Sequence, residues 1–510
     1  MFSDASASFE MFYVLSRNIH MPILANVIIL CRQLPWMLIF FLIAVSLIQF
    51  PQGEVRAETM TKEAFVALLK KSHPLFEKER LTSAIEKEEQ RSYLGDADWN
   101  LSSSLTWSRE EATITAFSPD ISKSLSLQTG VNKQFWETGG RLSATYAINR
   151  SSSSFEQAPL FSYPDTFYEN SVELQYSQPL LRNRGGKLSR LQYDLKAFDV
   201  DAAGIQAAEN IEEFLAESIS KYLDWVYLEE QKKIMSRRLG LSRREFERTQ
   251  RKFNAYLVDS VDVMRSKDAL NTWRQNLALV ELQLTALKEE LSVLTQSSAV
   301  LDAEPEFNLY ARHRPESLAS ARARLENSSR ILKILELRKK QLDVNAVGVR
   351  ETGKPDLSLI AAVTVKSAEE SAGDSFSFDK KDAAVGLQLS VPLENTTAKA
   401  EYHRTRLQTL QLGKEREDVT LSLEASLSSL HTQLNKLGEV LELNLEQIES
   451  ARLRTIEETK IYEQGRGDLT FVIMSRDNEE SSKLTYAENA LNYQKLWLQF
   501  QALMDELYGE

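Results

Sequence analysis

The sequence LQYSQPL at Leu174–Leu180 recurs as LQLSVPL at Leu387–Leu393, 213 residues further along the chain. Five of the seven residues are identical, and each copy alternates apolar and polar residues before ending in Pro-Leu. Pro179 is followed by no proline until Pro305, and Pro392 is the last proline of the chain. Because proline interrupts helices, the repeated sequence predicts a junction between a strand and a long helix, built twice.

Strand-like patterns precede both junctions, in residues 98–179 and again in residues 356–392. Leu101, Leu105 and Trp107, for example, alternate with serine and threonine. A period of two over segments of about ten residues predicts strands with one apolar and one polar face.

Helix-like patterns follow each junction. Residues 187–256 contain no proline and keep apolar residues three or four apart, which predicts a helix of about 105 Å at 1.5 Å per residue. A shorter helix is expected at 262–295. After the second junction a long helix is expected up to Glu463, then a break at Gly465-Arg466-Gly467 and a helix ending near Tyr508. Residues 60–94, with a break at His73-Pro74, and residues 315–347 also have helical spacing.

The order of these elements indicates an internal duplication. The first repeat spans 58–305, with a helix, strands in 98–179 and a helical hairpin in 187–296. The second repeat spans 306–510, with a helix, strands in 356–392 and a hairpin in 398–508. The expected fold is mainly α with β.

Residues 1–57 have the pattern of a leader and signal peptide. Leu34–Phe50 is an uncharged apolar stretch of 17 residues, preceded by Arg32 and followed by a small-residue cleavage site ending at Ala57. The alternative is an uncleaved membrane anchor, since 17 residues can just span a bilayer. The single cysteine, Cys31, lies before this stretch, so cleavage at Ala57 would leave a chain without thiol chemistry.

Composition and motifs argue against several classes of function. A net charge of −12 is unfavourable for binding nucleic acid. The histidines show no ligand spacing, so no metal site or cofactor is expected. They are His20, His73, His313, His403 and His431. No arrangement of residues suggests catalysis, and the chain is not expected to be an enzyme.

The strands can be interpreted as lipid-facing or as part of an ordinary half-buried soluble sheet. The neighbouring helices have narrow apolar seams suited to each other, so they offer no broad face to cover a sheet. A sheet that meets lipid outside and water inside fits the pattern better. Open sheet edges do not occur in lipid, and the strands of one chain are too few for a useful pore. The chain is therefore expected to oligomerise.

The two hairpin turns resemble each other at an offset of 209 residues, pairing Phe253 with Tyr462 and Asp259 with Asp468. The first turn is KFNAYLVDSVDVMRS and the second is IYEQGRGDLTFVIMS. Together with Pro179, Pro392 and the duplication, the turns resemble the TolC-like outer-membrane efflux proteins, whose hairpin tips carry a Tyr-x-x-Gly…Asp-Val pattern. The resemblance covers nearly all of residues 60–508.

The resemblance implies a homotrimer with a transmembrane β-barrel in outer-membrane lipid and a long periplasmic tunnel of antiparallel coiled-coil helices. It also implies a passive exit duct of a tripartite efflux or type I secretion system, docked at its tip onto an adaptor protein and an inner-membrane transporter. Asp262 and Tyr462 match gate-linking positions of the family. The expected tip and gate residues are Asp259, Asp262, Tyr462, Gly465, Arg466, Asp468 and Phe471.

This sequence also departs from the family pattern. Two acidic positions of the second turn fall on Phe471 and Met474, and Tyr256 replaces the glycine of the first turn. Asp468 and Arg466 are the nearest charges that could act instead.

Residues 122–150 add a hairpin, giving six strands where the family has four. Either three chains form an eighteen-stranded barrel or this hairpin projects outside it. A different class of function, a periplasmic coiled-coil scaffold or adaptor anchored by residues 34–50, would be expected to have one hairpin between compact β domains.

Overall fold

The computed structural model describes residues 59–112, 119–155 and 164–509. Residues Thr59–Glu510 form one compact unit. The leader, the expected cleavage site at Ala57 and Cys31 lie outside the described residues.

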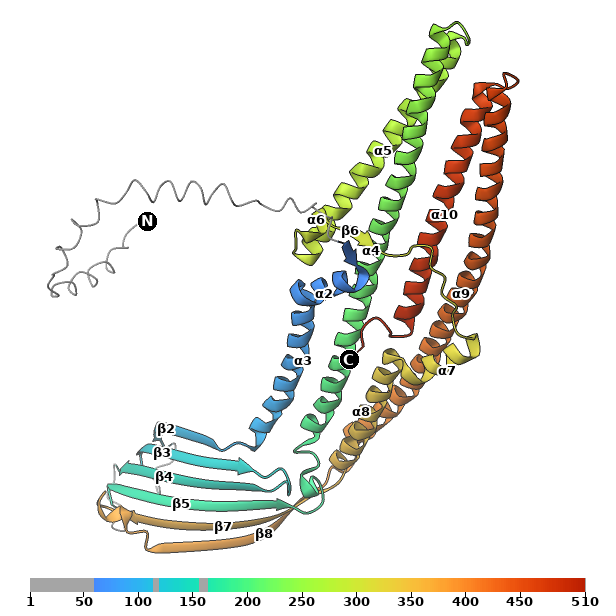
Figure 1. Cartoon of the computed structure of the whole chain (residues 1–510). Helices are drawn as coiled ribbons and strands as arrows, with labels where there is room; N and C mark the ends of the chain where they lie inside the picture. The colour runs from blue at the N-terminus through green and yellow to red at the C-terminus, as the bar shows by residue number, and fades with distance from the viewer. Residues whose placement is uncertain (1–58, 113–118, 156–163, 510) are drawn as a thin grey trace, which may run out of the picture. The chain divides into compact units, whose positions relative to one another are not determined.

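A six-stranded antiparallel sheet contains strands from both repeats, in the order β2-β3-β4-β5-β7-β8 (Figure 1). The hairpin at 122–150 lies within the sheet as β3 and β4, between β2 and β5. The strands are β2 (Asn100–Glu111), β3 (Ile121–Gln134), β4 (Arg141–Ser154), β5 (Thr166–Pro179), β7 (Asp356–Glu369) and β8 (Lys380–Ser390). Strands were thus expected in the correct regions, although they are longer than ten residues.

One face of the sheet is apolar across all six strands. Leu105 lies opposite Leu127, which lies opposite Ile148. Further along, Leu174 of β5 lies opposite Val363 of β7. The other face carries serine, threonine, asparagine and glutamine, as the period of two predicts. Most of the apolar face is open within the described chain, because Leu105 is 68% exposed and Val363 52%. At one end of the face, the 3₁₀ turn Asp374–Phe376 covers Asn170 and Ser367, which both bond to Ser375.

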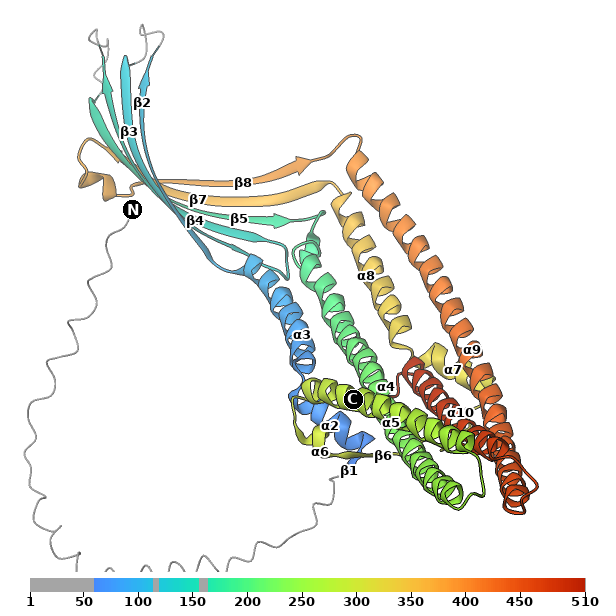
Figure 2. The same cartoon turned by 90° about the horizontal axis from the view of Figure 1, so that it is seen from above.

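Four helices continue from the sheet and lie side by side in the order α3, α4, α8, α9 (Figure 2). Their bounds are α3 (Pro74–Ser92), α4 (Leu191–Asn254), α8 (Arg330–Thr352) and α9 (Thr396–Glu463). β2 and β8 are the two edge strands of the sheet, and α3 and α9 are the two outer helices of the helix layer. Because β2 follows α3 and β8 precedes α9 in the chain, each open edge of the sheet continues into an open edge of the helix layer.

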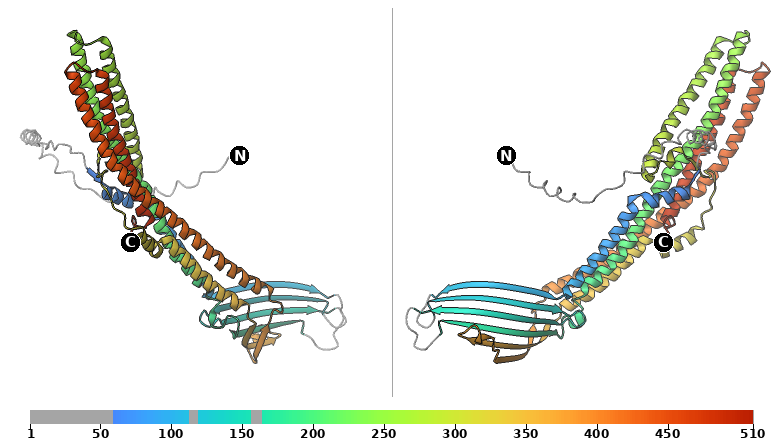
Figure 3. Two further views of the ribbon diagram at one scale, coloured as in Figure 1. Left: turned by 90° about the vertical axis from the view of Figure 1, so that its right-hand side faces the viewer. Right: turned by 60° about the vertical axis from the view of Figure 1, so that its left-hand side comes forward.

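Two helical hairpins extend away from the sheet, α4 with α5 (Ser260–Thr295) and α9 with α10 (Leu469–Leu503) (Figure 3). They pack on each other mainly through α4 and α10. The break at Gly465–Gly467 is confirmed, as is the break at His73-Pro74, which separates α2 (Lys62–Ser72) from α3. α4 begins at Leu191, after a short turn of 3₁₀ helix at Arg184–Gly186, and α10 ends five residues before Tyr508.

The helix expected at 315–347 is present but not continuous. It is interrupted at Ser329, between α7 (Leu318–Ser328) and α8. At this point the backbone N–H of Arg330 donates to Asp505 Oδ2 (2.9 Å), and the Arg330 guanidinium contacts Glu212 Oε2 (3.1 Å) and the carbonyl of Tyr508. The bond from the Arg330 N–H to Asp505 takes the place of a helical bond, and the guanidinium links this point to α4 and to the C-terminal tail. Helical spacing alone does not reveal these contacts.

The main hydrophobic core lies where α4 passes a short parallel strand pair, β1 (Thr59–Thr61) with β6 (Glu304–Glu306). Tyr222 and Trp225 of α4 are fully buried there with Phe65 of α2, and the Tyr222 hydroxyl donates to the Met60 carbonyl at 2.9 Å. The core therefore joins the start of the first repeat to its end.

The two strand-to-helix junctions have different local geometries. After Pro179, the chain turns through Gly185 and Gly186, both with left-handed φ, and Gly186 lies directly against the Trp136 carbonyl. After Pro392, the turn uses Asn395 at φ 51°, whose side chain donates to the carbonyl of Gly353 (2.8 Å).

Candidate functional site at the hairpin tips

The two tips are short turns with one left-handed residue each. The first runs from Ala255 to Asp259 with Tyr256 at φ 59°, and the second has Gly465 at φ 74°. Glycine adopts this conformation without strain, whereas tyrosine does so at a cost. Asp468 caps α10, because its Oδ1 accepts from the Thr470 N–H at 2.7 Å. Asp259 precedes α5 but its side chain makes no capping bond.

A single arginine connects two of the expected gate carboxylates. Arg265 Nη1 lies 3.3 Å from Asp262 Oδ1 on its own helix and 3.7 Å from Asp468 Oδ1 of the other hairpin. Hydrogen bonds from Thr470, and then the charge of Arg265, hold the pKa of Asp468 below its usual value. The structure thus brings Asp262 and Asp468 together through a residue that the turn pattern did not single out.

Two further contacts join the hairpins beside the tips. The Lys252 ammonium of α4 lies 4.3 Å from the centre of the Tyr462 ring of α9, a cation–π distance. Arg248 Nη1 of α4 lies 3.0 Å from Glu463 Oε1 of α9. Tyr462 therefore meets a cation of the other hairpin within this chain.

Apolar side chains are exposed on both tips. Tyr256 is 96% exposed, Leu257 71%, Phe471 56% and Met474 54%, while Val472 beside them is buried. Arg466 is exposed in the second turn, among the residues expected at the gate. The tips thus present a mixed surface of aromatic, aliphatic and charged groups.

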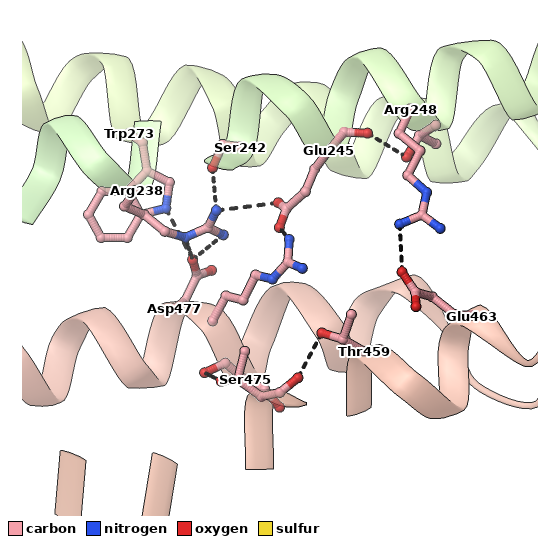
Figure 4. A network of polar contacts seen from close by, with 12 residues as sticks. Arg238, Ser242, Glu245, Arg248, Trp273, Thr459, Glu463, Ser475 and Asp477 are labelled. Carbon is pink, nitrogen blue, oxygen red and sulfur yellow. Dashed lines mark hydrogen bonds and ion pairs between the residues drawn. The ribbon is translucent and has the colours of Figure 1, made fainter. Parts of the chain in front are cut away.

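Further from the tip, a buried polar network joins three helices (Figure 4). Arg238 of α4 has no exposed surface, and its Nη2 lies 2.7 Å from Asp477 Oδ1 of α10. Trp273 of α5 donates its indole N–H to the same Oδ1 at 3.1 Å. Arg238 Nη1 also donates to Ser242 Oγ (2.6 Å) and lies 3.3 Å from Glu245 Oε2.

Glu245 extends this network across the hairpins, since it also pairs with Arg476 of α10. Burial, and then the nearby charge of Arg238, lower the pKa of Arg476. Two arginines and two carboxylates are thus gathered in a mostly buried site, and removing one would leave its partner without full compensation. Nearby, Thr455 of α9 donates to the carbonyl of Ser475 at 3.0 Å, closing the second hairpin. This arrangement can hold the two hairpins in one fixed register.

Only a weak sequence signal points to this network. Arg238 and Glu245 are seven residues apart on α4, the spacing of one seam, where an apolar residue is the usual occupant. Arg476 and Asp477 lie nine and ten residues after Gly467, and they could not be paired with α4 from spacing alone.

The described residues contain no helix long and apolar enough to cross a membrane. Within the same ranges, no three histidine, cysteine or acidic side chains are grouped as a metal site.

The sequence matches no protein-family model and no curated protein. Solved structures do match. VceC, an outer membrane protein of Vibrio cholerae, aligns with a TM-score of 0.62 over 88% of this chain and 96% of that chain, at 12% identity. The MtrE outer membrane channel of Neisseria gonorrhoeae gives 0.61 over 88% and 89%, at 14% identity. CusC gives 0.64 over 87% and 91%, at 10% identity.

The chain has the TolC-like fold. The resemblance expected from the hairpin turns and junctions is confirmed at the level of fold by these structures. VceC is described as an outer membrane protein, MtrE as an outer membrane channel, and CusC as a protein that forms a transmembrane channel. In a TolC-like chain, the tip contacts described above lie at the end of the helical hairpins that is remote from the sheet (Figure 1).

Proposed function

We propose that this protein is an outer-membrane exit duct, a homotrimer that passively conducts substrate from the periplasm to the exterior in a tripartite efflux or type I secretion system. The observation that carries this proposal is the six-stranded sheet whose apolar face is largely open, joined to long helical hairpins in a TolC-like fold. Lipid would cover the apolar face, and the polar face would line the water-filled side.

Gating is proposed to occur at the tips. The contacts Arg265 with Asp468, Lys252 with Tyr462, and Arg248 with Glu463 each join the first hairpin to the second. Opening by an outward movement of one hairpin would have to separate these pairs. Asp262 supports the closed state through Arg265, and Gly465 permits the turn that places Asp468.

The tip surface is proposed to dock an adaptor protein and an inner-membrane transporter. Phe471 and Tyr256 supply exposed aromatic area, which is enriched in interfaces. Asp259 supplies an exposed charge on the tip of the first hairpin, and Arg466 supplies one on the tip of the second. No substrate class is indicated by these residues.

Membrane fractionation of the expressed chain, followed by its mass in mild detergent and its conductance in a planar bilayer, tests the proposal. An outer-membrane trimer that begins near Glu58 and forms ion-conducting pores is expected. A monomer or dimer in the inner membrane that retains Leu34–Phe50 would overturn the duct in favour of an anchored scaffold.

A further inference from the structure

We propose that all six strands of each chain are wall strands, so that three copies close an eighteen-stranded barrel through a β2–β8 interface between neighbouring copies. This inference rests on the proposed function, from which it takes the number of copies in the barrel. It specifies that β3 and β4 widen the barrel, and that the open strand edges are occupied by a second copy of this chain.

The faces of β3 and β4 place them in the same wall as the other strands. Leu125 and Leu127 of β3 are 41% and 37% exposed on the apolar face, and Leu127 is directly flanked by Leu105 and Ile148. A hairpin that projected away from the barrel would have no reason to continue the lipid-facing surface of its neighbours. The alternation of residues between the two faces continues through β3 and β4 in the same register as in their neighbours.

Strand direction permits closure by identical copies. Every neighbouring pair in the sheet is antiparallel, and six is an even number, so β8 and β2 run in opposite directions. A second copy can therefore place its β2 beside β8 and continue the antiparallel pattern. Both edges are exposed along their full length apart from Ser108, and unpaired edges do not occur in a bilayer.

The ladder register gives the strand tilt. Starting at Asn100 of β2, directly opposite residues lead across the sheet to Ala384 of β8, which lies six residues before the end of that strand at Ser390. If the strand ends facing the helices form a level rim, Ser390 meets Asn100 of the next copy. Six residues correspond to about 20 Å along the strands and six strand spacings to about 29 Å across them. The resulting tilt is about 35°, within the usual range of closed barrels.

This register also matches the two faces across the interface. An offset of six residues is even, so apolar side chains of one copy meet apolar side chains of the next. Leu101 would lie opposite Leu389, and Leu105 opposite Val385, all of them more than 60% exposed in the single chain. On the other face, Ser104 would lie opposite Gly386.

The width of six strands fits the width of the helix layer. Six strands about 4.8 Å apart and tilted by about 35° occupy about 35 Å of perimeter, whereas four would occupy about 23 Å. Four packed helices, α3, α4, α8 and α9, occupy about 36–40 Å at 9–10 Å each. Six strands per chain therefore occupy nearly the same perimeter as the four helices, so the channel does not narrow where the helices meet the barrel. Three copies give a barrel about 34 Å across at the backbone, against about 22 Å for twelve strands.

Disulfide trapping tests both parts of the inference in the full chain carrying Cys31→Ser, which has no other cysteine. Ser104→Cys with Gly386→Cys probes the interface; no atom lies within 4 Å of the space a Cβ would take at Gly386. Ser104→Cys with Gln388→Cys, slipped by two residues, is the matched control for register. Ser103→Cys with Thr129→Cys probes β2 against β3, because these hydroxyls lie 3.0 Å apart.

We expect covalent trimers from the first pair, little linkage from the slipped pair, and an intrachain disulfide from the third pair. Linked trimers without the Ser103–Thr129 disulfide would overturn the eighteen-stranded wall while leaving the duct intact. Monomers that form no interchain link would overturn both. Counting strands in an electron cryo-microscopy map of the unsubstituted trimer does not depend on how the variants fold, and twelve strands there would refute the inference.

Discussion

At the scale of single residues, the strongest constraint on the hairpins is the buried pairing of Arg238 with Asp477. Arg238 is fully buried, while the Asp477 side chain is 41% exposed, so the arginine depends more on the pair than the aspartate does. Removing one member of a buried ion pair costs about 3–5 kcal/mol, because the remaining charge loses its partner.

We predict that Asp477→Ala destabilises the helical region by about 3 kcal/mol, at the low end because Ser242 and Glu245 still bond Arg238. Denaturant unfolding monitored by the fluorescence of Trp273, which loses its acceptor, measures the change. Asp268→Ala removes an exposed carboxylate of α5 and should change stability by less than about 0.5 kcal/mol. Equal effects of the two substitutions would show that the network contributes no stability.

The tip contacts are weaker, because Arg265 and Asp468 are about half exposed. Exposed ion pairs contribute about 0–1 kcal/mol each. Arg265→Gln removes both the Asp262 and the Asp468 contacts, so it should raise the open probability of single channels by up to a few fold. Asp262→Ala should raise it less.

Arg274→Gln, an equal charge change at an exposed position of α5, is the control for Arg265→Gln. An unchanged open probability in Arg265→Gln would show that Arg265, and with it Asp262, does not help to close the gate.

Glu209 should make stability depend on pH. Burial, and then the charge of Asp505, raise the pKa of Glu209 to about 7. The folded chain therefore holds a proton that the unfolded chain releases near pH 4.5, so stability falls as the pH rises from about 4.5 to 7. Glu209→Gln removes this loss, and it should raise the melting temperature at pH 8 with little change at pH 4.5. Glu289→Gln, at an exposed carboxylate of α5 that does not act on Glu209, controls for general loss of charge. An equal gain at both pH values would contradict the prediction.

At the scale of elements, the first strand-to-helix junction depends on two adjacent glycines. Both have left-handed φ near 70°, but a Cβ at Gly186 would lie 1.5 Å from the Trp136 carbonyl oxygen, whereas nothing lies within 4 Å of one at Gly185. Gly185→Ala should cost about 1–2 kcal/mol through backbone strain alone.

Gly186→Ala must also displace the β3–β4 turn, so we expect a larger loss of stability and a lower yield of folded sheet. Thermal melting in detergent compares the two variants directly. Equal losses would indicate that the junction tolerates movement of Trp136.

Much of the element order follows from sequence periodicity. The alternation around Leu101 and Leu125 predicts strands, and the proline-free runs predict the long helices, because both patterns are set by which face is apolar. The interruption at Ser329 and the pairing of Arg238 with Asp477 were not predictable in the same way. They depend on contacts between residues 175 and 239 positions apart, respectively, which periodicity does not encode.

At the scale of the whole molecule, the chain has two open edges, and each edge consists of one strand of the sheet and one helix of the helix layer. β8 and α9 form one edge, and β2 with α3 forms the other. Leu407, Leu421 and Leu443 of α9 are 60–66% exposed. Positions 407 and 443 are 36 residues, or ten turns, apart and therefore share a face. A single chain leaves this apolar stripe in water, and a neighbouring copy would bury it.

We predict that Leu443→Lys weakens the trimer at least tenfold, because burying a leucine contributes about 1.5–3 kcal/mol and 1.4 kcal/mol corresponds to a factor of ten. Native mass measurement over a dilution series in mild detergent gives the midpoint of dissociation. Leu443→Met keeps the apolar contact and should dissociate like the unsubstituted protein. If the lysine variant remains trimeric at the same dilution as the methionine variant, α9 does not form the edge between copies, and closure must depend on the strands alone.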